Sequence, residues 1–291
     1  IRAERPAVCV IDSIQTLWCA DLASAPGSVA QVREAAGRLL RVAKEDGIAI
    51  VLIGHVTKDG AVAGPRVLEH LVDAVLVFEG ERTGDLRILR AAKNRFGATS
   101  EIGVFEMTGT GLGEVVDPSE LLGRGELGSA GSAVACAIEG TRPILLEVQA
   151  LVAPSELEQP RRLATGVDRN RLAMLLAVLA RHAALPLGRM DVFVNVAGGV
   201  RIDEPAADLA VAVAIASAAR GAPAGPMLTM GELGLTGRLR PVPQAERRLR
   251  EARKLGLSHA LAPSGTLGLD GVTVRTATTV DEALRLALGD A

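Results

Sequence analysis

The chain has 291 residues, enough for two domains that each bury a hydrophobic core. Its formal net charge is −2 at pH 7, so no global basic field attracts nucleic acid, and any DNA contact must be local. Three scattered cysteines exclude a disulfide framework and a four-ligand zinc site within this sequence. The longest apolar runs, 172–180 and 209–219, are too short to span a bilayer, and no secretory pattern is present, so we expect a cytoplasmic protein without a membrane segment.

A buried parallel strand is predicted at 7–11, where an apolar run ends in Asp12 and Ser13. Ligands bind at the carboxyl ends of strands in open α/β sheets. An acidic residue there helps to hold Mg²⁺ in nucleotide hydrolases. Many strands also end in aspartate simply as a cap for the next segment, so the residues alone leave both interpretations of Asp12 open.

A helix is predicted after Ser28, which forms a capping-box pattern with Gln31. Helical spacing continues to a stop at Gly47. The next buried strand is predicted at 48–53, and a helix between two such strands is typical of a crossover in a parallel sheet. A further strand is predicted at 74–78.

Two more strands, 86–92 and 102–107, flank a turn that carries Lys93 and Arg95. Side chains of an extended chain repeat every two residues, so the two cations point the same way. Such a pair suits phosphate oxygens, because arginine gives planar donors and lysine a point charge. The alternative is a solvated hairpin tip. Phe96 argues against that alternative, because an exposed aromatic residue at a tip more often meets a partner.

The second half of the sequence follows a glycine-rich segment, 123–131, where we place a domain boundary. Its elements are predicted from runs of apolar residues and from helical spacing. In chain order these are strands at 132–138 and 144–152, a helix at 168–182, a strand at 191–196, an alanine-rich helix at 206–220 and an amphipathic helix at 244–255.

The densest basic cluster lies on and just before the last of these helices. It consists of Arg238, Arg240, Arg247, Arg248, Arg250, Arg253 and Lys254. One interpretation is a solvated helix face. The other, which we favour, is a platform for DNA phosphates that would be independent of base sequence, because no aromatic residues are interleaved. The DNA-binding candidates within the cluster are Arg238, Arg247, Arg248 and Arg250.

The turn sequence Lys93-Asn94-Arg95-Phe96-Gly97 resembles the signature pentapeptide of the bacterial RadA (Sms) family, RecA-like ATPases of DNA repair. The stretches 11–16, 24–29, 54–58, 63–70, 192–199 and 202–208 resemble the same family. The resemblance implies an α/β fold, in which residues 1–122 are the C-terminal portion of a RecA-like P-loop ATPase core with a mostly parallel sheet. After the linker at 123–131, it implies that 132–291 form an α+β domain similar to the protease domain of Lon.

The resemblance also implies roles for individual residues. Asp12 would belong to an Mg²⁺ site, His55 would sense a γ-phosphate unless it is a solvated loop residue, and Lys58 would lie in a loop facing DNA in a ring channel. DnaB-type helicases carry a similar Lys-x-Arg at the edge facing the next subunit. Lys93 and Arg95 are therefore expected to reach ATP held by the adjacent protomer, and the alternative is that they grip DNA.

In the Lon-like part, the position of the catalytic serine falls at Ala206 and that of its lysine near Glu246. Ala206 has no hydroxyl group, and a glutamate is unable to act as the neutral amine base of such a dyad. We therefore expect this domain to be proteolytically inactive. Ser217, three helical turns further along, is expected to be a packing residue.

No Gly-x-x-x-x-Gly-Lys-Ser/Thr phosphate loop occurs in the sequence. In the family, that loop and a four-cysteine zinc module precede the point where this sequence starts, so we expect an N-terminally incomplete copy that is inactive alone. The intact protein is expected to be a hexameric, ATP- and Mg²⁺-dependent ring that moves along single-stranded DNA, promotes branch migration of recombination intermediates and works with a RecA-type recombinase. The alternatives are a Lon-type Ser-Lys protease and a non-enzymatic, ring-forming DNA-binding scaffold.

Overall fold

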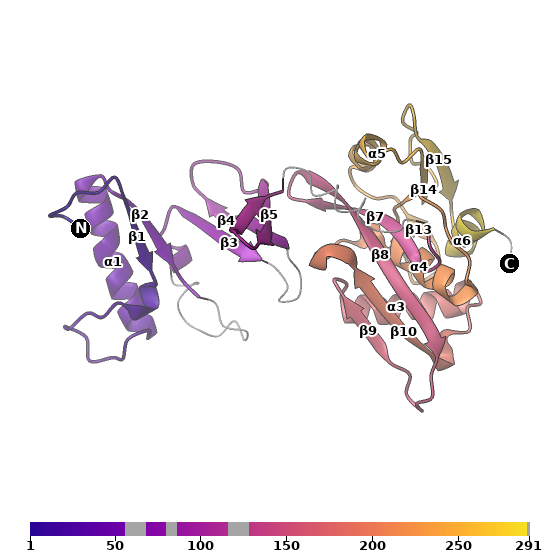
Figure 1. Cartoon of the computed structure of the whole chain (residues 1–291), viewed down its shortest axis with the longest axis horizontal. Coiled ribbons are helices and arrows are strands. Elements are labelled where there is room, and N and C mark those ends of the chain that lie inside the picture. Colours follow the sequence, from indigo (N-terminus) through magenta and orange to yellow (C-terminus); the bar gives the residue numbers. More distant parts are fainter. Residues whose placement is uncertain (56–67, 80–85, 116–127, 290–291) are drawn as a thin grey trace. The chain divides into compact units, whose positions relative to one another are not determined.

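The computed structural model describes residues 1–55, 68–79, 86–115 and 128–289. The chain divides into two compact units (Figure 1). Unit 1 contains residues 1–77 and 91–99, and unit 2 contains 78–90 and 100–291. The domain boundary predicted at 123–131 falls mostly outside the described residues and stays a prediction.

Unit 1 is built around two parallel strands, β1 (Val8–Asp12) and β2 (Ala49–Ile53), in which Asp12 is the partner of Ile53. The helix α1 (Val29–Asp46) connects them, and a short 3₁₀ helix, η1 (Ile14–Thr16), follows β1. The buried side chains of α1 share a small core with Ile14 of η1. This arrangement confirms the predicted strand–helix–strand unit, because the apolar face of α1 turns inward, as the 3.6-residue period requires. The prediction that both strands are buried is wrong, because alternate side chains such as Val10 and Val51 are exposed.

The ends of α1 are only partly as predicted. Ser28 accepts a hydrogen bond from the Gln31 amide at 3.4 Å, and Gly47, with φ +66°, donates its N–H to Ala43 at the other end. The capping box is wrong in its second half, because the Gln31 side chain does not return to Ser28. It is fully buried and bonds to the loop at residues 19–24 instead.

A four-stranded sheet follows in the order β3-β4-β5-β6. Strands β4 and β5 pair antiparallel, with Arg90 opposite Ile102, which confirms the predicted hairpin. The strands are β3 (Ala74–Glu79), β4 (Leu86–Asn94), β5 (Ile102–Thr108) and β6 (Gly111–Glu114).

Unit 2 contains a seven-stranded sheet in the order β15-β14-β11-β7-β8-β10-β9. The pairs of β8 with β7 and with β10 are antiparallel, and the other neighbours are parallel, so the sheet is mostly parallel and the class is mixed α/β. Its strands are β7 (Ser132–Glu139), β8 (Arg142–Pro154), β9 (Arg162–Thr165), β10 (Met190–Val196), β11 (Leu228–Thr229), β14 (His259–Pro263) and β15 (Thr273–Ala277).

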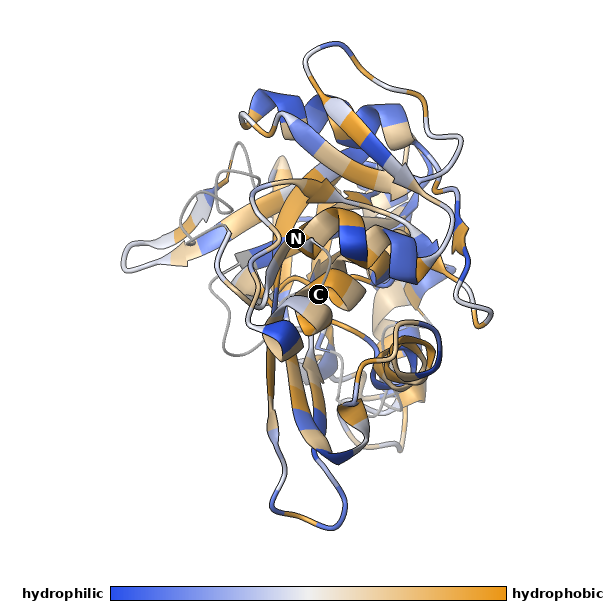
Figure 2. Cartoon of the chain, turned by 90° about the vertical axis from the view of Figure 1, so that its right-hand side faces the viewer, coloured by the Kyte–Doolittle hydropathy of each residue, from blue (hydrophilic) through white to orange (hydrophobic). Residues whose placement is uncertain are grey.

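Helices cover both faces of this sheet. Ala133 and Ala135 of β7 belong to the core formed with α3 (Arg169–His182), α4 (Asp208–Arg220) and α6 (Val280–Leu288). Val134 and Cys136 belong to a second core with α5 (Ala245–Lys254). Because alternate residues of a strand face opposite sides, α5 lies on the side opposite the other three helices. Figure 2 shows the long central strands coloured mainly as hydrophobic.

Short elements complete unit 2. They are η3 (Leu187–Arg189), η4 (Ala197–Gly199), η5 (Pro205–Ala207), β12 (Glu232–Leu233) and β13 (Leu239–Arg240). The alanine-rich helix α4 begins at Asp208, two residues later than predicted, because η5 precedes it. Among the described residues, no helix has the length and apolarity that crossing a membrane would need.

Candidate functional site

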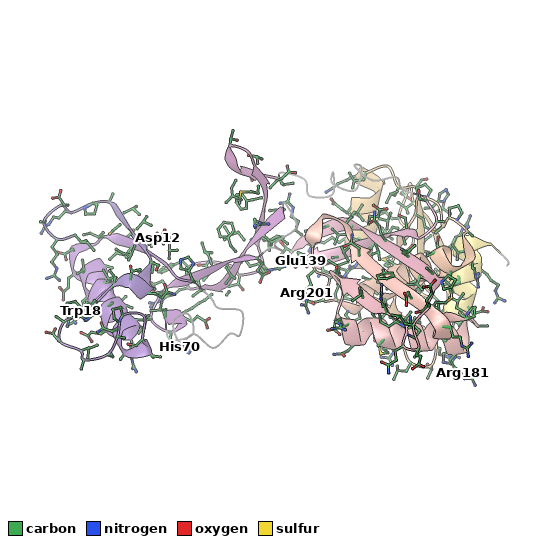
Figure 3. The ribbon with its side chains drawn as sticks, turned by 60° about the horizontal axis from the view of Figure 1, so that its bottom comes forward. Asp12, Trp18, His70, Glu139, Arg181 and Arg201 are labelled. Atoms are coloured by element: carbon green, nitrogen blue, oxygen red, sulfur yellow. The ribbon has the colours of Figure 1, made fainter. Side chains whose placement is uncertain are left out.

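The carboxyl edge of the parallel pair in unit 1 brings two predicted site residues together. Asp12 is the last residue of β1, and His55 lies two residues after β2. The two strands run side by side and end together, since Asp12 is the partner of Ile53. Both side chains are exposed, and Figure 3 shows Asp12 at this edge. The edge therefore offers a carboxylate and an imidazole to a ligand, as expected for ligand sites at carboxyl ends of parallel strands.

Sequence reasoning missed Gln15, which joins these two strand ends. Its Nε2 donates a hydrogen bond to the His55 carbonyl at 3.2 Å. Its Oε1 is buried without a partner among the described residues. A Cβ atom at Gly54 would lie 3.6 Å from Gln15 Nε2, so the amide rests directly on that glycine. The sequence offered one signal for Gln15, namely an amide side chain three residues after the aspartate that ends the strand.

The donor set at this edge limits the kind of metal it suits. Within the described ranges, no three His, Cys, Asp or Glu side chains gather as metal ligands. Asp12 is a single exposed carboxylate. Such a group fits a Mg²⁺ ion that keeps several waters and is bound mainly by phosphates, and it does not fit a metal enclosed by protein ligands.

At the end of β4, Lys93 within the strand and Arg95 just after it both face the segment 69–73, as the two-residue repeat predicts. Lys93 Nζ donates to the carbonyls of Glu69 and Val72, each at 2.8 Å. Arg95 Nη1 lies 3.1 Å from Asp73 Oδ1, and the Arg95 side chain is 67% exposed. The Lys93 ammonium thus ties two segments together. The exposed Arg95 pair is worth only about 0–1 kcal/mol and is readily exchanged for another anion.

The other residues of the pentapeptide shape the turn. Asn94 Oδ1 accepts the Phe96 N–H at 3.2 Å, and Asn94 Nδ2 donates to the Ala98 carbonyl at 3.2 Å. A Cβ at Gly97 would lie 3.0 Å from Asn94 Nδ2, so glycine leaves room for this side chain. Phe96 is 80% exposed. The turn is therefore held by its own side chains and presents Phe96 and Arg95 to solvent.

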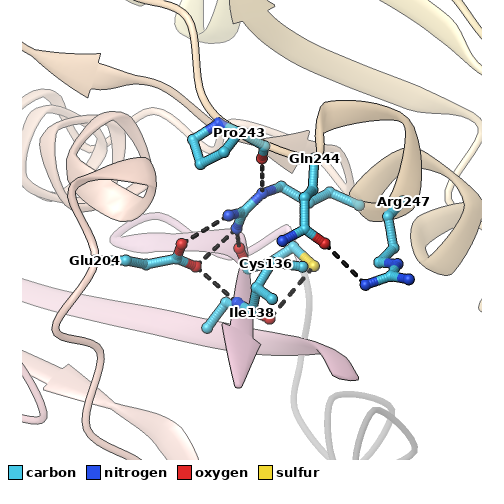
Figure 4. A network of polar contacts seen from close by, with 8 residues as sticks. Cys136, Ile138, Glu204, Pro243, Gln244 and Arg247 are labelled. Carbon is cyan, nitrogen blue, oxygen red and sulfur yellow. Dashed lines mark hydrogen bonds and ion pairs between the residues drawn. The ribbon is translucent and has the colours of Figure 1, made fainter. Parts of the chain in front are cut away.

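In unit 2, the structure corrects the assignment of Arg248 as a DNA-binding residue. Its side chain is fully buried, and its guanidinium donates to both carboxylate oxygens of Glu204 and to the carbonyls of Cys136 and Pro243. Glu204 also accepts the Ile138 N–H at 2.7 Å (Figure 4). A guanidinium whose donors all point into the protein is unable to contact DNA.

The remaining basic residues of the cluster are exposed but largely engaged. Arg247 donates to the Thr141 carbonyl at 3.0 Å, and Arg250 pairs with Glu246. The other contacts are those of Arg240 with Glu232, Arg253 with the Asp270 carbonyl and Lys254 with Glu251. Much of the cluster's positive charge is therefore balanced locally. Arg238, Arg247 and Arg250 stay candidates for DNA contact, and Lys58 lies outside the described residues.

The two positions at which the resemblance implies a degenerate protease dyad differ in environment. Ala206 is 3% exposed and packs in the core shared by β7 and α5. Glu246 is exposed, with its carboxylate paired to Arg250. Ser217 is fully buried, accepts the Gly131 N–H at 2.8 Å and donates to the Ala222 carbonyl at 2.6 Å. The last contacts confirm the expectation that Ser217 is a packing residue.

A partly buried ion pair joins Arg171, which is half-buried, to Asp208, which is buried and lies near Ala206 in sequence. Arg171 holds Asp208 with both ends of its guanidinium, and Asp208 Oδ2 also accepts the Leu233 N–H at 2.9 Å. Burial raises the pKa of Asp208 above its ordinary value, and the Arg171 guanidinium opposes that shift. The pair borders a cavity of about 330 Å³ whose polar lining includes Asp168 and Arg201. The charges of Arg171 and Asp208 are paired with each other, so this ion pair organises the start of α4 and offers no nucleophile.

Comparison with known proteins gives two findings. Residues 168–266, all in unit 2, match the family described as subunit ChlI of Mg-chelatase. Nearly the whole chain is similar to proteins called DNA repair protein RadA. It is 50% identical to that of Bacillus subtilis over 99% of this chain, 54% to that of Pseudomonas aeruginosa over 97%, and 51% to that of Synechocystis over 94%.

The chain spans 64% of the Bacillus and Pseudomonas proteins and 55% of the Synechocystis protein. Half of the residues are identical along almost all of the chain, and this agreement includes both units. Over the part of these proteins that it spans, the chain is similar throughout to bacterial proteins named DNA repair protein RadA.

Proposed function

We propose that the protein is a DNA-dependent ATPase of recombinational DNA repair. It would process recombination intermediates and promote branch migration along single-stranded DNA, as a hexameric ring in the cytoplasm, together with a RecA-type recombinase. The observation that carries the proposal is the shared carboxyl edge of two parallel strands, at which Asp12 ends one strand and His55 follows the other. The similarity to DNA repair proteins named RadA supports the DNA part.

At this edge, Asp12 would orient the waters around a Mg²⁺ ion, which supplies charge neutralisation for the phosphates of ATP. His55 would sense the γ-phosphate. Gln15 supports that role, because its amide holds the main chain of His55 at 3.2 Å. A change at the phosphate that moves His55 would reach η1 and the loop after it through this hydrogen bond.

Arg95 would act on the ATP of the neighbouring protomer. Its side chain is exposed and stands on a turn held by Asn94. The ion pair it would have to leave, within the described ranges, is with the exposed carboxylate of Asp73. A guanidinium that reaches the transferred phosphoryl group is worth roughly 10³- to 10⁵-fold in rate. Lys93 would support the turn through its two carbonyl contacts, which agrees less well with direct phosphate binding.

Unit 2 would be a Lon-like domain without protease activity. In support of this, Ala206, at the expected serine position, has a buried methyl group, and Glu246, at the expected lysine position, has an exposed carboxylate. The domain would then serve the ring as a scaffold and as a site of DNA contact through Arg238, Arg247 and Arg250. The scaffold alternative is therefore kept for unit 2 and not for the whole protein.

The trans role of Arg95 is tested by mixing subunits of the full-length gene product. Arg95→Ala should abolish most DNA-stimulated ATP hydrolysis without altering thermal stability. A second variant, Asp12→Asn, should be equally inactive. Mixed rings bring an intact Arg95 next to an intact Asp12 at some interfaces, so mixing two inactive variants should partly restore hydrolysis. Hydrolysis that survives Arg95→Ala alone would overturn this role. If mixing Lys93→Ala with Asp12→Asn also restored hydrolysis, the trans role would extend to Lys93.

A further inference from the structure

The loop after η1 presents the chain's only tryptophan to solvent. Trp18 is 63% exposed, although its neighbour Cys19 is buried and Leu17 packs against the same core (Figure 3). Tryptophan side chains are on average largely buried, so an indole as exposed as that of Trp18 is unusual. In the loop at residues 17–24, here called the Trp18 loop, the neighbours of Trp18 therefore pack against the core, whereas the indole itself stays in solvent.

A buried glutamine fixes the shape of this loop. Gln31 of α1 is fully buried, and its Oε1 accepts the Cys19 N–H at 2.7 Å. Its Nε2 lies within hydrogen-bond distance of the carbonyls of Cys19, Leu22 and Ser24, at 3.1, 3.2 and 2.9 Å. A satisfied buried amide of this kind specifies one backbone conformation. The exposed indole is thus held in place before any partner arrives, which lowers the entropy cost of binding.

The position of the loop connects it to the proposed nucleotide site. It follows β1 and η1, on the carboxyl side of the two parallel strands where Asp12 and His55 lie. Gln15, within η1, donates to the His55 carbonyl. A ligand bound to Trp18 would therefore contact a loop that follows η1, and η1 is hydrogen-bonded through Gln15 to the strand end that carries His55.

The chemistry around the indole favours a flat, apolar ligand face over a phosphate. Arg38, which contacts this loop through Asp21 at 2.6 Å, is also paired with Glu34 at 2.8 Å and is therefore already engaged. Phosphate attraction is therefore weak at this point, whereas a nucleobase needs only a π-face to stack. We propose that Trp18 stacks on the bases of single-stranded DNA without sequence preference. This inference rests on the DNA binding that belongs to the proposed function.

Trp18 provides its own reporter, because the 291-residue chain contains no other tryptophan. Oligo(dT) should quench its fluorescence, and an abasic oligonucleotide with the same number of phosphates should not. In anisotropy titrations, Trp18→Ala should weaken oligo(dT) binding by about 5- to 150-fold, since one base–aromatic stack is worth about 1–3 kcal/mol. Trp18→Phe should retain most of the affinity. Leu267→Ala, which removes another strongly exposed apolar side chain, should retain all of it.

Two further results separate the alternatives. If the wild-type chain binds oligo(dT) without quenching, or Trp18→Ala binds within twofold of wild type, the stacking proposal is overturned while DNA binding stands. If the wild-type chain does not bind oligo(dT), the DNA part of the proposed function fails as well. A Trp18→Ala variant that loses oligo(dT) and abasic binding equally, with a smaller assembly mass by light scattering, would assign the indole to a protein contact and overturn the proposal.

Discussion

The Arg248 guanidinium and the Glu204 carboxylate form a two-pronged ion pair, with Nη1–Oε1 and Nη2–Oε2 distances of 2.7 and 2.6 Å. Their positions are 44 residues apart, and the Arg248 side chain has no exposed surface, whereas Glu204 is 24% exposed. The pair joins α5 to the turn before η5 and, through Ile138 and Cys136, to the end of β7. It fixes the helix that carries the basic cluster onto the sheet.

Arg248→Met should therefore destabilise unit 2 strongly. Removing one partner of a buried pair leaves the other uncompensated and costs about 3–5 kcal/mol, and the partial exposure of Glu204 places the expected value near the lower limit. Arg250→Ala removes an exposed arginine from the same helix and should change stability by less than about 0.5 kcal/mol. Urea unfolding followed by circular dichroism measures both. Equal effects of the two variants would show that the buried pair does not brace the sheet.

Cys136 should make the protein less stable in alkaline solution. Burial raises the pKa of its thiol from 9.0 to about 12. Between those values the unfolded chain loses the thiol proton and the folded chain keeps it, so the free energy of unfolding falls as pH rises. The contribution of the protonated thiol to the free energy of unfolding is fully present below pH 9, and about 1.4 kcal/mol of it is lost by pH 10.

Cys136→Ala removes this titration and serves as the comparison. Unfolding of both proteins in urea at pH 8 and pH 10 gives the measurement. The wild type should lose about 1.4 kcal/mol more than the variant over this interval. Identical losses would mean that the thiol titrates equally in the folded and unfolded states.

Exposed arginines of unit 2 should contribute to DNA binding through charge alone. Replacing Arg238, Arg247 and Arg250 together by alanine should weaken binding to oligonucleotides of different sequence by the same factor. Each lost phosphate contact lowers the slope of log K against log salt by about 0.7 for single strands, so the slope should fall by about 2. Anisotropy titrations over a range of salt concentrations measure it. An unchanged slope would identify the cluster as a solvated face paired with its own acids.

The elements that follow from local patterns were predictable from the sequence. Ser28 and Gly47 mark the ends of α1, and the apolar runs before Asp12 and Gly54 give the parallel pair. Strands as short as β11, with two residues, contain no period to detect, and their place depends on the neighbouring strands. The helix α6 has a Thr279 cap and an apolar face, so it was within reach of the same reasoning but was missed.

The candidate site was predictable only where chain position determines it. Asp12 and His55 lie at strand ends, which the sequence shows directly. Arg248 was assigned to the surface because its partner Glu204 is distant in sequence, and helical spacing does not reveal an ion pair of that kind. The carbonyl partners of Lys93, 21 and 24 residues earlier, depend on how the chain returns in unit 1.

Asp12 is proposed to serve ATP hydrolysis at the edge of the parallel pair, and this role is tested by steady-state hydrolysis by the full-length gene product with and without oligo(dT). Asp12→Asn preserves size and should lower the DNA-stimulated rate by about 100-fold or more, since metal-assisted charge stabilisation is worth several kcal/mol. Glu45→Gln, at an exposed carboxylate near the end of α1 that pairs with Arg2, should hydrolyse ATP at the wild-type rate. A wild-type protein without DNA-stimulated hydrolysis, or an Asp12→Asn variant as active as Glu45→Gln, would contradict this role of Asp12.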